Sequence, residues 1–150
     1  MEAVTFSHHN VIQLIHERTI PLRVAHDQEP LSSQFQVKHT PNLVILDVEG
    51  HEVHRHVGFL PPEEFVPFLL LGLAKVDLAR QAFDEALEGL EMLLRDYPRS
   101  GSSPEAVFLE GQARYKKQGD PKPLREAYEA LAATFPENEW TKKASRYRFI

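Results

Sequence analysis

The second half of the chain carries an internal repeat with an offset of 38 residues, and no other feature restricts the fold as strongly. In each copy an apolar helical stripe runs into an aromatic-Pro step, a short polar loop and a second helix. The matching residues are Leu90, Leu93, Leu94, Tyr97, Pro98 and Ala106 in the first copy, and Tyr128, Leu131, Ala132, Phe135, Pro136 and Ala144 in the second. This period is typical of helix-pair solenoids, which usually need at least three repeats. We therefore expect these helices to pack against the first segment or against a partner.

Helical periodicity predicts a run of helices from about Val76 onward. A single apolar stripe over residues 79–97 predicts one helix, Pro104 begins the next, and a third follows the turn at Gly119. Trp140 belongs to a short final helix. The aromatic side chains at helical spacing are interpreted as core residues: Phe83, Tyr97, Phe108, Tyr115, Tyr128 and Phe135.

Residues 1–75 instead alternate helix and strand signals, which predicts an α/β segment. The first helix carries Val11 on its apolar face, with Ser7 or Asn10 as its cap. Strands are predicted at residues 20–25, 42–47 and 52–57. The run 42–47 is almost entirely apolar, as expected for a strand covered on both faces. Helical turns are predicted over residues 29–35 and from Pro61 onward.

The stretch 37–50 resembles the second half of a thioredoxin-like domain. It combines a Thr40-Pro41 step, a buried strand and a turn from Asp47 to Gly50, in that order. The resemblance implies a cis Thr40-Pro41 bond whose backbone pairs with a substrate peptide. Thr40 and Pro41 are therefore candidate peptide-binding residues, although the step could simply be the turn that such a fold requires.

The chain departs from that family at its redox motif. The family's Trp-Cys-x-x-Cys and the strand leading into it would precede Met1, and the chain contains no cysteine. Because thiol–disulfide exchange needs a thiolate, we expect neither that activity nor any cofactor from the chain as given. The main hypothesis is a non-catalytic thioredoxin-fold protein acting in protein interaction. The alternative is a thiol–disulfide oxidoreductase whose Cys-x-x-Cys N-terminus is missing from this sequence.

Residues 79–146 resemble tetratricopeptide-type helical hairpins, with Tyr97-Pro98-Arg99-Ser100 as the most characteristic step. The resemblance implies a protein-binding or packing role. The expected organisation is thus an incomplete thioredoxin-like α/β segment at 1–75, followed by an all-α tetratricopeptide-like segment at 76–150.

Charge and hydropathy argue against two kinds of partner, nucleic acids and membranes. The net charge of −5 argues against nucleic acid as a main partner. The apolar run 65–74 is too short to span a bilayer and no signal peptide is visible, so we expect a cytoplasmic protein without membrane insertion. A protein or peptide partner is the remaining expectation.

The histidines are the plausible metal ligands of the sequence. All eight lie between His8 and His56. His54 and His56 point to the same face of the predicted strand, and Glu52 could complete a site with them, so these two are weak metal candidates. The simpler interpretation, which we favour, is an exposed strand face that carries imidazoles. The cluster Lys142, Lys143, Arg146 and Arg148 is likewise interpreted mainly as a solvated face.

The predicted strands 20–25 and 42–47 would flank a central strand that this chain lacks. Three outcomes follow: direct pairing of the two into a three-stranded sheet with 52–57, strand addition by a second chain, or poor order. We favour direct pairing, and strand addition would allow a homodimer through the unpaired sheet.

Overall fold

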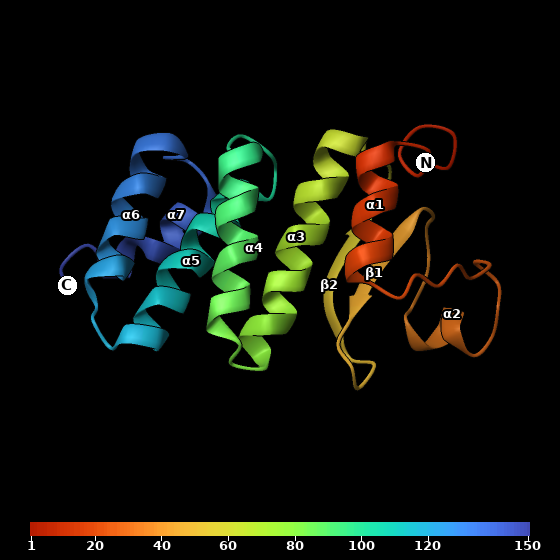
Figure 1. The fold of residues 1–150 in the computed structure, drawn as a ribbon, viewed down its shortest axis with the longest axis horizontal. Helices are drawn as coiled ribbons and strands as arrows, with labels where there is room; N and C mark the ends of the chain where they lie inside the picture. The colour runs from red at the N-terminus through yellow and green to blue at the C-terminus, as the bar shows by residue number, and fades with distance from the viewer. The chain divides into compact units, whose positions relative to one another are not determined.

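The computed structural model describes residues 1–150, which divide into two compact units, 1–66 and 67–150. The first unit contains a small sheet with helices and the second is entirely helical, so the predicted fold class is confirmed (Figure 1). The boundary between the units falls inside helix α3 (Pro62–Ala79). No helix of the chain is long and apolar enough to cross a membrane.

The sheet of the first unit has only two strands, β1 (Asn42–Leu46) and β2 (Glu52–Val57). They pair antiparallel, with Asn42 opposite Val57 and Val44 opposite Arg55, and the register shifts between Ile45 and Leu46. The turn between the strands holds Gly50 at φ +85°, where glycine meets no steric penalty. The strand at 52–57 and the turn at Gly50 are therefore as predicted, although the burial of β2 does not alternate, since residues 53–56 are all half-buried.

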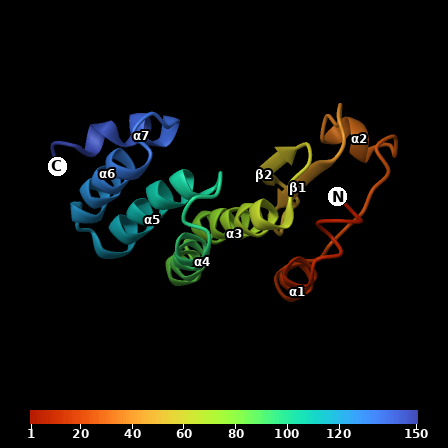
Figure 2. The ribbon, with the colours of Figure 1, turned by 90° about the horizontal axis from the view of Figure 1, so that it is seen from above.

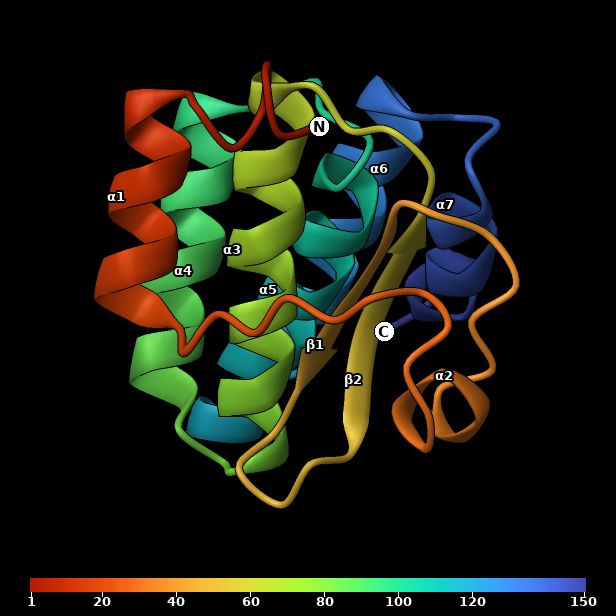
Figure 3. The same ribbon diagram turned by 90° about the vertical axis from the view of Figure 1, so that its right-hand side faces the viewer.

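The predicted strand at 20–25 is wrong, and so is the three-stranded sheet. These residues form no strand, and no backbone–backbone hydrogen bond involves residues 20–24. In Figure 3 the segment crosses the direction of β1 and β2 and does not run alongside them. Ile20 is 98% exposed and Leu22 is 79% exposed. A strand needs a neighbour as well as a suitable sequence, and Pro21 also lacks one of the donors that a ladder would use.

The two helices of the first unit are α1 (His9–Arg18) and α2 (Leu31–Gln34). Neither predicted residue caps α1: His8 is its N-cap residue, and the Ser7 hydroxyl instead donates to the carbonyls of Ala3 and Val4. The expectation that β1 is covered on both faces is also wrong, because its residues are half-buried and Leu46 is 40% exposed. A two-stranded hairpin has too few neighbours to bury a strand completely.

The N-terminal turns are held by a few buried contacts within the first unit. Thr5 is fully buried and its hydroxyl donates to the Leu60 carbonyl at 2.5 Å. The rings of Phe6 and Phe65 meet edge to face, with centroids 5.4 Å apart. Val11, the predicted core residue of α1, is also fully buried.

The second unit continues from α3 into α4 (Phe83–Asp96), α5 (Ser103–Gln118), α6 (Lys122–Thr134), α7 (Glu139–Ala144) and a 3₁₀ turn η1 (Ser145–Tyr147). Figure 2 shows α4, α5 and α6 following one another side by side. The predicted single helix over 79–97 is wrong at its start. Ala82 donates its N–H to the Asp77 carbonyl and Gln81 takes φ +62°, which ends α3 in a left-handed turn.

The 38-residue offset recurs in the backbone geometry. α4 ends at Tyr97 with φ −132° and ψ 53°, and α6 ends at Phe135 with φ −132° and ψ 54°. The Tyr97 carbonyl accepts the Ser103 hydroxyl at 2.6 Å, and the Phe135 carbonyl accepts the Thr141 hydroxyl at the same distance. The two helix ends therefore share one backbone conformation and one hydroxyl–carbonyl hydrogen bond.

Helices α5 and α6 approach closely at Gly111. A Cβ at that position would lie 2.6 Å from the Ala127 Cβ and 2.9 Å from the Pro123 carbonyl oxygen. Beside this contact, Phe108, Leu131 and Ala144 form a buried cluster that joins α5, α6 and α7. The helices α5, α6 and α7 thus share one core.

Candidate functional site

The hairpin leaves β1 with an open edge. The Gly58 N–H donates to the Pro41 carbonyl at 2.8 Å, which places residue 41 among the hydrogen-bonded positions of the ladder. Since these positions alternate in an antiparallel pair, the backbone groups of Leu43 and Ile45 face β2. Those of the even-numbered residues in β1 point away from it, and no third strand pairs with them.

Thr40 and Pro41 lead directly into this edge. Thr40 is exposed, Pro41 is half-buried, and the peptide bond between them is cis. The Pro41 carbonyl already pairs with Gly58 inside the hairpin. The peptide-binding role of the two residues stays a prediction.

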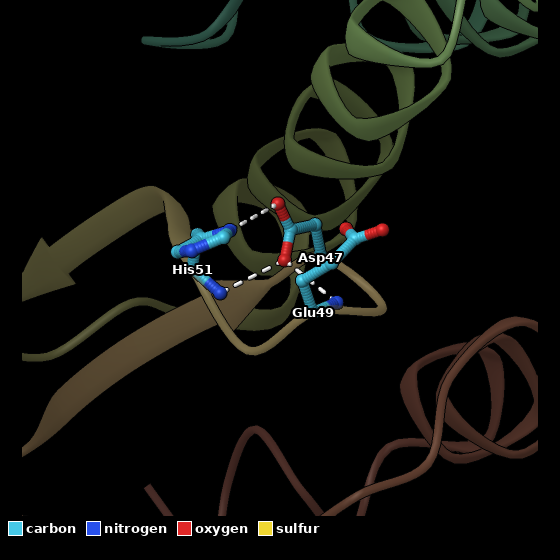
Figure 4. Close-up of side chains that lie close together, drawn as sticks. All are labelled: Asp47, Glu49 and His51. Carbon is cyan, nitrogen blue, oxygen red and sulfur yellow. Dashed lines mark hydrogen bonds and ion pairs between the residues drawn. The ribbon is translucent and has the colours of Figure 1, made fainter.

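The turn after β1 is organised by the Asp47 carboxylate (Figure 4). Its Oδ1 accepts the backbone N–H groups of Glu49 at 3.0 Å and His51 at 2.8 Å, while its Oδ2 lies 3.3 Å from the His51 Nδ1. The hydrogen bond from the His51 N–H, joined by those from the His51 ring and the Glu49 N–H, lowers the pKa of Asp47 below its ordinary value, against a smaller opposing effect of burial. The carboxylate therefore holds the turn in its ionised form.

Potential metal ligands gather at this turn, while a metal site at His54 and His56 stays a prediction. One ligand atom from each of Asp47, Glu49 and His51 lies within 4.8 Å of the others. Both Asp47 oxygens are already engaged by donors of the turn, and the other two side chains are exposed, so the cluster acts as a turn-stabilising network. Sequence reasoning missed this cluster, although its alternate spacing along the turn was available as a signal.

The carboxylate proposed to join His54 and His56 is occupied elsewhere. Arg55 holds Glu52 through both oxygens, at 2.8 and 2.5 Å. This pairing lowers the pKa of Glu52 and raises that of Arg55. The same guanidinium donates to the Phe35 carbonyl at 2.8 Å and the Asn42 side chain at 3.2 Å. Arg55 therefore ties the loop after α2 to the hairpin, and it lines a pocket together with Gln34, Phe35, Gln36 and Glu52.

Comparison with known protein families gives a match, and the matched residues include this hairpin. Residues 1–72 match the family model of a thioredoxin-like domain. The match covers the first unit and α3 as far as residue 72, and the two-stranded hairpin is consistent with an incomplete thioredoxin-like sheet. No curated protein and no solved structure matches the chain.

Proposed function

We propose that this chain acts in protein interaction, and that its thioredoxin-like segment accepts an extended strand of a partner along the open edge of β1. The observation that carries the proposal is the unpaired row of backbone groups on Asn42, Val44 and Leu46. Such an edge is a template for strand addition, in which main-chain hydrogen bonds supply affinity. A second copy of the chain is one such partner, which would make a homodimer through the sheet.

The neighbouring apolar segment supports the proposal. Residues 20–24 belong to no helix or strand, have no backbone–backbone hydrogen bonds, and expose Ile20 and Leu22. Exposed alternating apolar residues are typical of a strand that completes its pairing on association. The helical segment, proposed to be tetratricopeptide-like, is consistent with the same role because stacked helix pairs present binding surfaces.

Photo-crosslinking tests the proposal in the cells that make the protein. A photoreactive residue replaces Leu46, which is 40% exposed at the open edge. We expect discrete crosslinked products, including one of twice the chain's mass if the partner is a second copy. Val44→Pro removes an N–H that points outward, so it should abolish these products while sparing the β1–β2 ladder.

Ile45→Pro is the matched control, because it removes an N–H that pairs with β2. It should unfold the hairpin, as seen by loss of strand signals in NMR spectra, whereas Val44→Pro should not. Crosslinks that persist in Val44→Pro, or an absence of discrete products in the parent chain, would count against strand addition.

A second candidate function is thiol–disulfide exchange by a longer product of the same gene. The match of residues 1–72 to a thioredoxin-like domain favours it. An in-frame Trp-Cys-x-x-Cys encoded just before Met1 would support this candidate, and a stop codon in that position would eliminate it.

A further inference from the structure

The last eleven residues bring cations and aromatic rings together in the second unit. Lys143 Nζ lies 3.8 Å from the centre of the Trp140 ring. Arg146 lies 5.2 Å from the ring of Tyr147, and Arg148 lies 5.4 Å from that of Phe149. Significant cation–π pairs occur roughly once per 70–80 residues. Three within so short a stretch mark a surface that differs from the rest of the chain.

Three of the four cations of this stretch also differ in lacking acidic partners. Elsewhere in residues 67–150 most lysines and arginines form ion pairs, namely Lys75, Arg80, Arg95, Arg114, Lys117, Lys122 and Arg125. Lys142, Arg146 and Arg148 are exposed, and none of them forms a salt bridge. Only Lys143 does so here, with Glu139 at 2.9 Å. The end of the chain is therefore locally positive, although the net charge of the whole chain is −5.

The aromatic rings give this surface a fixed base. Trp140 and Tyr147 pack against Phe108, with ring centroids 5.2 and 6.0 Å apart. The Tyr147 hydroxyl accepts a hydrogen bond from Gln112 at 3.2 Å. Phe149, in contrast, is 87% exposed. The surface thus combines cations that lie beside packed aromatic rings with one large, exposed apolar side chain.

We propose that Lys142, Arg146, Arg148 and Phe149, here called the C-terminal patch, dock an acidic peptide segment of a partner protein. Carboxylates of the segment pair with the three unpartnered cations, and an apolar side chain beside them covers Phe149. Guanidinium groups suit this role because their planar fork binds carboxylates in a bidentate manner. The patch lies outside the β1 edge, so this proposal does not depend on strand addition.

An acidic peptide fits the patch better than a membrane or a nucleic acid does. Stable attachment to a bilayer takes a larger apolar face or a longer polybasic cluster than one exposed ring and three cations. An extended polyanion would also meet the negative charge of the remaining chain. A short acidic segment contacts the patch alone and avoids that repulsion.

Trp140 makes the test direct, because it is the only tryptophan in the chain and stands beside the patch. The probe is a synthetic peptide of Glu and Asp around one central Leu, titrated into the full chain at low salt. We expect a saturable change in tryptophan emission that weakens as NaCl rises to about 0.5 M. A peptide with Lys in place of the acids should give no change.

Matched charge reversals locate the site. Lys142→Glu with Arg146→Glu should weaken binding by about tenfold, since two exposed ion pairs are lost and two repulsions appear. Arg99→Glu with Lys116→Glu reverses two other exposed cations that form no salt bridge in the same unit, and binding should be unchanged. Phe149→Ala should weaken binding of the Leu-containing peptide but not of an all-acidic one.

Three results would overturn the proposal. The first is equal loss of binding in both double variants while their circular dichroism spectra remain unchanged. The second is the absence of any saturable signal with the acidic peptide. The third is binding to anionic phosphatidylserine vesicles or to single-stranded RNA that is tighter than binding to the peptide. Val44→Pro should leave peptide binding intact, so failure here is distinct from failure of the proposed strand addition.

Discussion

Two glycines in the helical unit differ in how much space surrounds them. Gly111 faces α6 with no room for a methyl group, whereas a Cβ on Gly89 would lie 3.9 Å from the Ala74 Cβ, an ordinary contact. Glycine inside a helix costs about 0.5–1 kcal/mol relative to alanine. The glycine at 111 therefore serves packing, and the one at 89 serves no purpose that the contacts show.

Gly111→Ala should lower the free energy of unfolding by about 1–3 kcal/mol, because the new methyl group would force α5 and α6 apart. Gly89→Ala is the control and should raise it by about 0.5–1 kcal/mol. Urea unfolding followed by Trp140 fluorescence measures both. Equal effects of the two substitutions would contradict the close approach at Gly111.

Asp47 should titrate below the ordinary value of about 3.9 for an aspartate. The hydrogen bonds that lower its pKa stabilise the folded turn above that pH, and this contribution is lost as pH falls through the folded pKa. NMR titration of the carboxyl carbon gives the midpoint, and the His51 amide should shift with it.

Asp47→Asn should remove the acid-induced shift of the His51 amide, and Glu49→Gln should leave it unchanged. A midpoint for Asp47 at or above about 3.9 would show that the turn gains nothing from the ionised carboxylate.

At the scale of elements, the two equivalent helix ends depend on a hydroxyl. Ser103 and Thr141 each donate to the last aromatic residue's carbonyl at 2.6 Å, and Ser103 is fully buried. Ser103→Ala and Thr141→Val should each cost about 0.5–1.5 kcal/mol, because each removes one of the two hydrogen bonds that the helix-end carbonyl accepts and leaves only the backbone donor, Ser100 or Asn138. Thr141→Ser keeps the hydroxyl and should cost less. Thermal unfolding measures the series, and unequal roles for the two hydroxyls would appear as a much larger loss at one position.

Most helices and the hairpin of β1 and β2 were predictable from the sequence, whereas the pairing of a third strand was not, for a physical reason. A helix makes its hydrogen bonds within one segment, so the apolar period of residues 104–115 was sufficient to predict α5. Residues 20–25 have strand-forming composition, but a strand depends on a neighbour that composition does not specify. The end of α3 was missed because Gln81 adopts the left-handed conformation without being glycine.

The candidate site was only partly predictable for the same reason. The Thr40-Pro41 step and the Gly50 turn are local features and were recognised. The engagement of Glu52 by Arg55, which removes it from His54 and His56, depends on side-chain geometry within β2. The open edge of β1 exists because residues 20–25 do not pair with it. The sequence had predicted that they would.

At the scale of the whole molecule, the two units differ in how their secondary structure is supported. The helical unit has a series of fully buried residues, including Leu90, Leu93 and Leu131. The sheet has two strands and no fully buried residue in either. Isolated two-stranded hairpins are marginally stable, so the sheet is expected to be the first part to open.

Hydrogen exchange should show this order of stability. The amides of Leu43 and Ile45, which face β2, should exchange faster than those of Leu90 and Leu93 in α4. Val44→Asp should unfold the hairpin while the helical amides keep their protection, because a carboxylate cannot replace a half-buried valine. Slower exchange in β1 than in α4 would contradict the prediction.

The unpaired course of residues 20–24 has one further consequence, for proteolysis. A protease binds its substrate as an extended chain, and here the chain is exposed, outside any helix or strand, and free of backbone–backbone hydrogen bonds that would have to break first. Arg23, whose side chain is 84% exposed, offers trypsin a cleavage point within this segment. Brief digestion should therefore cut first after Arg23, and the cut should slow if residues 20–24 also become paired when a partner binds.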